Sequence, residues 1–341
     1  MESGEIRSRA PTRIGIAGGG TDIPAFFDKN GGACLNVGIS LYSYTSFKRI
    51  PTNHTKIISY DWNFERDITD LKIEGNMNTA NNVDVVKACM THARLNPKNG
   101  YEIIISSSAK KNSGLAGSSA LLVSMLASMK NHAGHSMMDK NKFVLEAYDI
   151  ERIKLNRAGG MQDQCVSVFG GANFIEFRKE RLDINPLRLS SDILCELHSS
   201  MLLFELPYQR ECQASKIEEK KIKNMADNVD YLTQIKQYAY DSKQALLKGD
   251  MEWLGILMDS SWAIKRKMEG VSTKDIDRTY ALAKSVGAYG GKLCGAGGGG
   301  SMVFLCPLEK RKNIINMMEQ TGCKQTHFDF DYNGVHSWRT D

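Results

Sequence analysis

Glycine is the residue that most constrains this chain, because many of its thirty glycines gather into clusters. The clusters occupy residues 15–20, 114–117, 159–171 and 287–300. Glycine has no Cβ atom, so a run of glycines marks a place where the backbone turns sharply or comes close to another group. Both halves of the chain are therefore expected to contain loops in which the backbone closely approaches a partner.

The composition is that of an ordinary globular protein. Hydrophobic residues make up 42% and charged residues 24%, which excludes an intrinsically disordered or collagen-like chain. The net charge of +5 is small, and bases and acids are interleaved in the run 216–223. We interpret this run as a solvated helix face and expect no nucleic-acid partner. At roughly 100–200 residues per domain, the length predicts two domains.

Three features bear on the compartment. The N-terminus carries Glu2 and Glu5 and no apolar run, so no signal peptide is expected, and the apolar stretch 116–129 is too short to cross a bilayer. His132 and His135 lack acidic or thiol partners nearby, and no Cys-x-x-Cys pair occurs, so a zinc site is not expected. We therefore predict a cytoplasmic protein with reduced thiols and no membrane partner. A homo-oligomer is compatible with the sequence.

The hydrophobic pattern predicts a mixed α+β chain. Strands are expected where β-branched and aromatic residues concentrate, and helices where apolar residues recur every three or four positions. We place a domain boundary near Pro186, which divides the chain into domains 1–187 and 188–341. The expected strands are 13–17, 44–48, 56–60, 101–106, 173–177, 201–206, 292–293, 302–305 and 325–330. The expected helices are 83–93, 121–131, 143–150, a long helical region 215–268, 275–286 and 310–318.

The glycine cluster in residues 113–120 is the most informative. It reads Ser-Gly-Leu-Ala-Gly-Ser-Ser-Ala, after a predicted strand and before a predicted helix. The N–H groups of such a loop, together with the helix dipole, can hold phosphates, and Ser118 or Ser119 can ligate Mg²⁺. The loop is not a Walker A motif, and the cluster 15–20 lacks the Rossmann spacing. The alternative is a plain turn whose serines cap the helix.

Two carboxylates and a last glycine loop complete the candidate site. Phosphoryl transfer needs one carboxylate on the metal and a second acid near the attacking hydroxyl. Glu151 and Asp163 can fill these roles, although acids on a helix surface have the same appearance in a sequence. The loop 295–300 is either a flexible hairpin or a second place where backbone closes on a ligand. We favour the ligand, because ordering so many glycines is entropically unfavourable.

In this order, the loops resemble the three signature motifs of the GHMP kinases, and the resemblance extends from residue 9 to 338. The first motif is Ala-Pro-Thr-Arg at 10–13 with Gly-Gly-Gly-Thr-Asp at 18–22, the second is the loop 113–120, and the third is 292–299. In the second motif, lysine, alanine and glycine replace the usual proline, second glycine and first serine, at positions 110, 116 and 117. The resemblance implies a two-domain α+β fold, with an N-terminal domain like ribosomal protein S5 domain 2, a ferredoxin-like C-terminal domain, and the site between them.

The resemblance also implies roles for individual residues. Asp163 would be the catalytic base, Arg13 would help to hold it ionised, and Ser118 and Glu151 would bind Mg²⁺. The residues expected to hold the phosphates of ATP are Gly114, Leu115, Ala116, Gly117, Ser118 and Ser119. The residues expected to bind the sugar are Gly20, Thr21, Asp22, Arg157, Arg210, Gly297 and Gly298.

Within the family, the segments 160–164 and 328–338 are most similar to kinases of D-glycero-D-manno-heptose 7-phosphate. The resemblance implies transfer from ATP to the anomeric hydroxyl, giving the 1,7-bisphosphate for nucleotide-activated heptose and bacterial surface glycans. The stretch 206–210 departs from the pattern of these kinases. The candidates for the contact to the 7-phosphate are Lys111, Lys292 and, favoured for their bidentate geometry, Arg157 and Arg210.

Two alternatives stay open at this point. One is a 1-kinase of an unphosphorylated sugar such as fucose. The other is a non-catalytic sensor of sugar and ATP, which the joint presence of Ser118, Glu151 and Asp163 disfavours. The adenine pocket is expected in the segment that contains Trp62 and Met77, although such side chains more often belong to a core.

Overall fold

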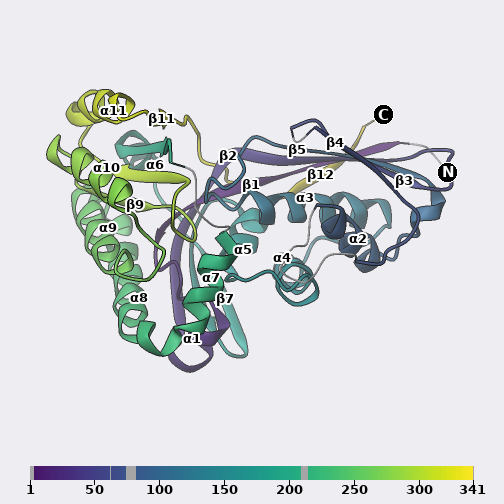
Figure 1. Cartoon of the computed structure of the whole chain (residues 1–341), viewed down its shortest axis with the longest axis horizontal. Helices are drawn as coiled ribbons and strands as arrows, with labels where there is room; N and C mark the ends of the chain where they lie inside the picture. The colour runs from purple at the N-terminus through teal and green to yellow at the C-terminus, as the bar shows by residue number, and fades with distance from the viewer. Residues whose placement is uncertain (1–3, 62, 74–81, 209–213, 341) are drawn as a thin grey trace.

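The computed structural model describes residues 4–61, 63–73, 82–208 and 214–340. Two β-sheets organise the fold, one in each half of the chain (Figure 1). The larger sheet has eight strands in the order β12-β1-β2-β5-β3-β4, with β6 paired to β2 and β7 paired to β6. Its strands are β1 (Glu5–Ala17), β2 (Gly32–Arg49), β3 (Thr55–Ser59), β4 (Phe64–Ile68), β5 (Tyr101–Ser107), β6 (Ala172–Arg178), β7 (Arg181–Pro186) and β12 (His336–Thr340).

The smaller sheet has four antiparallel strands in the order β11-β8-β10-β9. Helices from the second half pack against it, α9 on β9 and β10 and α11 on β11. The strands are β8 (Met201–Glu205), β9 (Gly290–Leu293), β10 (Ser301–Leu305) and β11 (Lys324–Gln325). The helices of this half are α6 (Ser191–Ser200), α7 (Ala214–Lys223), α8 (Met225–Lys248), α9 (Met251–Lys265), α10 (Lys274–Ser285), α11 (Arg311–Gln320) and the short η3 (Leu308–Lys310).

The helix α3 (Gly117–His132) forms the centre of the N-terminal half. It contacts β1 and β2 on one side and the other helices of this half on the other, so residues 119–130 are all buried. Burial of a leucine or methionine side chain is worth about 1.5–3 kcal/mol, which makes α3 a rigid base for the loop that precedes it. The remaining helices of this half are α1 (Pro24–Asn30), α2 (Asn82–His92), η1 (Pro97–Asn99), α4 (Lys140–Tyr148), the π-helical turn η2 (Asp149–Lys154) and α5 (Gln162–Phe169).

The hairpin of β1 and β2 joins the two halves. Its outer part pairs within the large sheet, while the part near its turn packs on α8. There Ile14, Ile16 and Leu35 share one buried core with Leu246 and Leu254 of the second half. Figure 1 shows these purple strands running down toward α1, between the two halves. The loop at the end of β1 is thereby held at the boundary between the halves.

Most of the predicted elements are confirmed, and the differences have physical causes. The region 215–268 is three helices, with Asn224 between α7 and α8. The second break arises because Gly249 ends α8 in a left-handed conformation and Asp250 caps the start of α9 by accepting from the N–H of Trp253. Of the expected strand 325–330, only its beginning pairs with β8, and Phe330 makes a single bridge to Ile39.

The C-terminal segment departs from a simple division of the chain. The boundary between 1–187 and 188–341 stays a prediction, and it falls between β7 and α6. However, β12 pairs antiparallel with β1, so residues 336–340 belong to the sheet of the N-terminal half. This strand was not expected from its own residues, because its partner lies at the opposite end of the chain.

Gly18 shows why the first glycine cluster is needed. Its φ is +83°, and a Cβ atom there would lie 1.9 Å from the carbonyl oxygen of Ala33. The hydroxyl of Thr21 donates to the carbonyl oxygens of both Gly18 and Ala33, at 2.8 and 2.9 Å. The loop is thus closed tightly on β2, and Asp22 follows directly.

We predict that Gly18→Ala lowers the free energy of unfolding by at least about 3 kcal/mol, since steric overlap adds to the cost of left-handed backbone. Gly134→Ala is the matched control: φ is +72° there, but a Cβ atom would meet nothing within 4 Å. Its expected loss is about 1 kcal/mol. Denaturant unfolding of both variants checks this, and equal losses would contradict the role of close approach.

Candidate active site

A cavity of about 880 Å³ lies between the two halves and collects most of the predicted site residues. The N-terminal half supplies β1, the loop after it, the loop before α3, η2 and the start of α5. The second half supplies α7, the last residue of α9, β9 and the loop after β9. The predicted position of the site between two domains is therefore consistent with the cavity.

The loop before α3 has the geometry of an anion-binding loop. Gly114 and Ala116 have φ values of +79° and +67°, and α3 begins immediately afterwards at Gly117. Alanine in the left-handed region costs about 1–2 kcal/mol, so this conformation must be held by its surroundings. Residues 114 and 116–119 line the cavity at the N-terminal end of α3, whereas Leu115 is buried beneath them.

The third motif packs against this loop. A Cβ atom on Gly295 would lie 2.8 Å from Cα of Gly114, and one on Gly300 would lie 2.7 Å from the carbonyl oxygen of Ser113. The N–H of Ser301 also donates to the carbonyl oxygen of Ser113, at 2.8 Å. The glycines of motif three therefore let the second half support the loop directly.

Arg13 and Asp163 both line the cavity and form an ion pair. Nε and Nη2 of Arg13 donate to Oδ1 of Asp163 at 2.9 and 2.7 Å, and Nη1 donates to the carbonyl oxygen of Gly114 at 2.7 Å. Burial lowers the pKa of Arg13, but the attraction of Asp163 outweighs this and raises it. The predicted placement of Arg13 beside Asp163 is thus what the structure has.

Asp22 lies on the same wall of the cavity and is 3% exposed. Its carboxylate accepts from the N–H groups of Gly20 and Gln162, at 3.0 and 3.2 Å. Burial, followed by the charge of Asp163, raises the pKa of Asp22. A Cβ atom on Gly160 would lie 1.9 Å from Oδ2 of Asp22, so the carboxylate fits there only because residue 160 has no side chain.

Glu151 is buried in η2, an irregular π-helical turn of a kind often found at functional sites. Its Oε2 accepts from Oγ of Ser119 at 2.7 Å and from Nε2 of Gln164 at 2.5 Å. Ser118 is exposed and lines the cavity beside it. The serine that contacts Glu151 directly is therefore Ser119, and the assignment of Ser118 and Glu151 to one Mg²⁺ ion stays a prediction.

Several predicted sugar-binding residues have other surroundings. Thr21 is buried on its own loop, and the missing Cβ atoms of Gly297 and Gly298 would contact Val271 and Ile217, so these three are not among the described residues that line the cavity. Gly295 and Ala296 line it instead. Predictions for Trp62, Met77 and Arg210 lie outside the described residues.

Arg157 and Lys111 do line the cavity. Burial lowers the pKa of Arg157, and the nearby charges that act on it are those of Glu151, Arg152 and Asp84. Arg157 therefore lies at the end of the cavity that contains Glu151.

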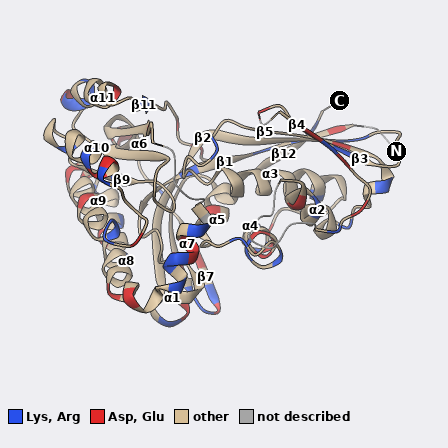
Figure 2. Ribbon diagram, viewed as in Figure 1, with Lys and Arg blue, Asp and Glu red and all other residues tan. Residues whose placement is uncertain are grey.

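Other charged residues in and behind the cavity lining were not predicted from the sequence. Arg152 has Nη1 3.5 Å from Oε1 of Glu151 and Nη2 4.0 Å from Oδ2 of Asp163. Lys265 lines the cavity, and Lys221 lies behind it. A lysine in the last turn of a helix is common and gives no signal in the sequence. Figure 2 shows basic residues in blue and acidic residues in red on α7, which contains the run 216–223 that was predicted to be a solvated helix face. Lys221 belongs to this run but is buried.

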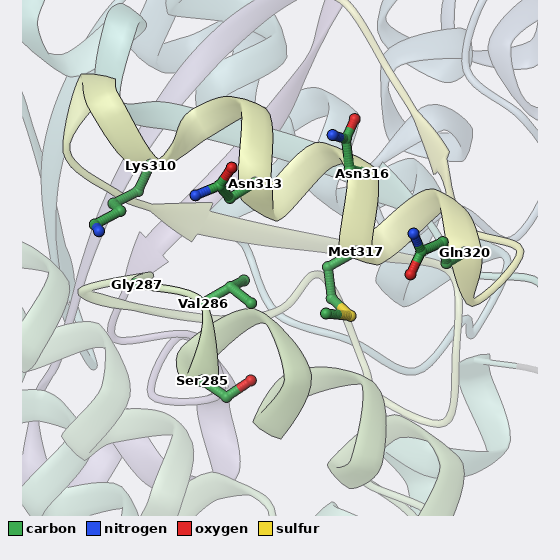
Figure 3. A pocket seen from close by; sticks show the side chains of 8 residues that line it. All are labelled: Ser285, Val286, Gly287, Lys310, Asn313, Asn316, Met317 and Gln320. Atoms are coloured by element: carbon green, nitrogen blue, oxygen red, sulfur yellow. The ribbon is translucent and has the colours of Figure 1, made fainter.

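A second hollow lies between the end of α10 and α11 (Figure 3). It contains no residue of the three motifs, and Lys310 is the one charged side chain in its described lining, so we assign it no role. Free thiols among the described cysteines lie at positions 34, 89, 165, 195, 306 and 323. No helix in the described ranges has both the length and the apolar character for crossing a membrane.

Both halves of the chain match known proteins in sequence. The N terminal domain of GHMP kinases matches residues 82–171 and the GHMP kinases C terminal domain matches residues 242–324. The D-glycero-alpha-D-manno-heptose 7-phosphate kinase of Campylobacter jejuni is 34% identical over 98% of this chain and 99% of its own length. The bifunctional fucokinase/GDP-fucose pyrophosphorylase of Arabidopsis thaliana is 24% identical over 96% of this chain but 32% of that protein.

A solved structure agrees with these relatives. The D-glycero-D-manno-heptose 1-phosphate kinase of Bacteroides thetaiotaomicron superposes with a TM-score of 0.80 and 28% identity, covering 98% of this chain and 99% of that one. Both halves of the chain match in sequence, and the fold matches over nearly its whole length. The chain therefore belongs to the GHMP kinase family.

Proposed function

We propose that the chain transfers the γ-phosphoryl group of ATP to the anomeric hydroxyl of D-glycero-D-manno-heptose 7-phosphate, giving the 1,7-bisphosphate. The observation that carries this proposal is that Arg13 ties Asp163 to the loop before α3, in a cavity that Asp22 also lines. The heptose 7-phosphate kinase at 34% identity supports the choice of sugar. The product would supply nucleotide-activated heptose for bacterial surface glycans.

Asp163 would act as the base. Nε and Nη2 of Arg13 both donate to Oδ1, whereas Nη2 of Arg152 lies 4.0 Å from Oδ2, beyond hydrogen-bond distance. Oδ2 is therefore the oxygen that can accept the proton of the sugar hydroxyl as the phosphoryl group is transferred. Arg13 favours the charged form of Asp163 and fixes its direction toward the cavity. Asp22 would accept hydrogen bonds from other hydroxyls of the sugar.

ATP and Mg²⁺ would bind on the other side of Asp163. The loop from Gly114 to Ser119 and the N-terminal end of α3 suit the phosphates. No group of three or more acidic, histidine or cysteine ligands for a metal occurs in the described part of the chain. Mg²⁺ needs few protein ligands when substrate phosphates and water complete its shell. Glu151 and Ser118 would hold the ion, which neutralises charge on the transferred phosphoryl group.

The two alternatives are weaker. The fucokinase relative is more distant, at 24% identity, than the heptose kinase. A non-catalytic sensor would not need a carboxylate that lines the cavity and is held by a buried arginine, yet Asp163 has this arrangement. A sugar phosphotransferase therefore explains the arrangement of Asp163 better than a non-catalytic sensor does.

The choice of sugar is tested by coupled ADP formation with Mg-ATP and a panel that contains heptose 7-phosphate, unphosphorylated heptose and fucose. We expect heptose 7-phosphate to have the highest kcat/KM, by at least about 10²-fold, because a site built for a charged group discriminates strongly against analogues that lack it. Comparable rates with fucose would end the heptose assignment.

Asp163→Asn should reduce kcat by about 10²–10⁴-fold, because the amide cannot accept the proton. Asp183→Asn, which removes an exposed ion pair with Arg181 on β7, is the matched control and should leave kcat unchanged. Thermal unfolding of both variants shows whether Arg13 tolerates the loss of its partner's charge. Turnover within a few-fold of the parent would mean that Asp163 is not the base.

Ser118→Ala and Ser119→Ala separate metal binding from support of Glu151. Ser118→Ala should raise the Mg²⁺ concentration for half-maximal rate by about 10- to 100-fold, with little change in stability. Ser119→Ala should lower the free energy of unfolding by about 1–3 kcal/mol, since a buried carboxylate loses a donor. Magnesium titrations and denaturant unfolding distinguish the two, and the reverse pattern would move the metal contact to Ser119.

A further inference from the structure

Three lysines of the second half gather at one wall of the cavity. They come from three elements: Lys221 from α7, Lys265 from the end of α9 and Lys292 from β9. They are only 5%, 5% and 4% exposed, which is rare for lysine. Burial of several like charges near one another is unfavourable unless something compensates for them.

Two of the three lysines have partners within the protein. Nζ of Lys221 donates to the carbonyl oxygen of Ala296 at 2.5 Å and lies 3.1 Å from Oε1 of Glu218. Nζ of Lys292 donates to the carbonyl oxygen of Gly15 at 2.7 Å. Lys265, by contrast, lines the cavity and has neither a hydrogen bond nor an ion pair among the described residues. Its ammonium group is therefore the one available for a ligand.

The surroundings of Lys265 disfavour the charged form of its side chain. Burial, followed by repulsion from Lys221 and Lys292, lowers the pKa of Lys265 to about 7. The acids that also act on it are Glu218, already paired with Lys221, and Asp22, already bound by two backbone N–H groups. An arriving anion would restore the charged form of Lys265 and relieve this repulsion.

Contacts around Gly19 show where Lys265 lies relative to Asp163 in the cavity. A Cβ atom on Gly19 would lie 3.4 Å from Nζ of Lys265 and 3.6 Å from Nε2 of Gln162. Gln162 directly precedes Asp163, so the path from the base to the lysine runs along the loop that holds Asp22. Arg157 responds to a different set of charges, around Glu151, and thus lies toward the opposite end.

We propose that Lys265, in the positive field of Lys221 and Lys292, binds the phosphate group that the sugar substrate already carries. This inference rests on the proposed function, because it assigns the far end of the same sugar site. A phosphate monoester carries close to two negative charges at neutral pH, and a buried ammonium group binds it strongly through a charge-assisted hydrogen bond. A sugar without this phosphate would leave Lys265 buried and unpaired, so the same lysine would favour phosphorylated sugars.

The test is Lys265→Met, which keeps the length of the side chain and removes its charge. With heptose 7-phosphate, KM should rise by about 10²-fold, while kcat/KM for unphosphorylated heptose and KM for ATP stay within a few-fold of the parent. Lys267→Met is the matched control, because Lys267 is exposed and does not line the cavity. It should leave all these constants unchanged.

Stability and binding measurements separate the possible failures. Lys265→Met should unfold at a temperature no lower than the parent, since it removes an unpaired buried charge. Equal losses with both sugars would overturn the proposal and make Lys265 a residue for the sugar ring or the fold. If the parent phosphorylates neither sugar, the proposed function fails instead.

Inorganic phosphate is a probe that does not depend on turnover. With a nonhydrolysable ATP analogue and Mg²⁺ at saturation, phosphate should raise the melting temperature of the parent and of Lys267→Met, but not that of Lys265→Met. Equal shifts in all three proteins would overturn the lysine site.

Discussion

The ion pair of Arg13 with Asp163 is the contact on which the rest of the site depends. The same guanidinium binds the carbonyl oxygen of Gly114, and the backbone N–H of Arg13 donates to the carbonyl oxygen of Leu115 at 3.0 Å. One residue of β1 therefore sets the distance between Asp163, the proposed base, and the loop before α3. The planar fork of arginine makes several directed bonds at once, which the single ammonium of lysine does not. Because Arg13 is buried, loss of its partner would leave an uncompensated charge.

The glycine clusters follow from the number of loops that must meet around this ion pair. Gly160 makes room for the carboxylate of Asp22, and Gly295 and Gly300 let the second half touch the phosphate-binding loop. In each case the neighbour that a Cβ atom would strike is a backbone or carboxylate group of the site. These three glycines come from distant parts of the chain, so close packing around the ion pair explains part of each of their clusters, whereas Gly170 and Gly287 pack against Gly334 and Lys310 elsewhere.

How far the sequence predicts this site depends on the kind of contact. Arg13, Asp163 and Glu151 were found because their positions are tied to motifs, and the strands and helices around them follow hydrophobic patterns. The contact of Ser119 with Glu151 was not predicted, because the direction of two adjacent serines depends on the left-handed turn at Ala116 just before them. Lys265 was not predicted, since only the packing of α9 against the first half shows that it is buried.

The two ends of the cavity handle negative charge by different physical means. At the loop before α3, backbone N–H groups and a metal ion can hold phosphates without a buried side-chain cation, so their binding leaves little mark on the net charge of +5. At the other end, Lys265 is buried beside two further lysines, where the low dielectric strengthens any ion pair. A buried cation of this kind is unfavourable when unpaired and favourable when paired, so under the proposal it would contribute to selection of the substrate as well as to its affinity. This difference between the two ends matches their proposed ligands. ATP always carries its phosphates, so the nucleotide end need not select for them, whereas sugars differ in whether they carry a phosphate group.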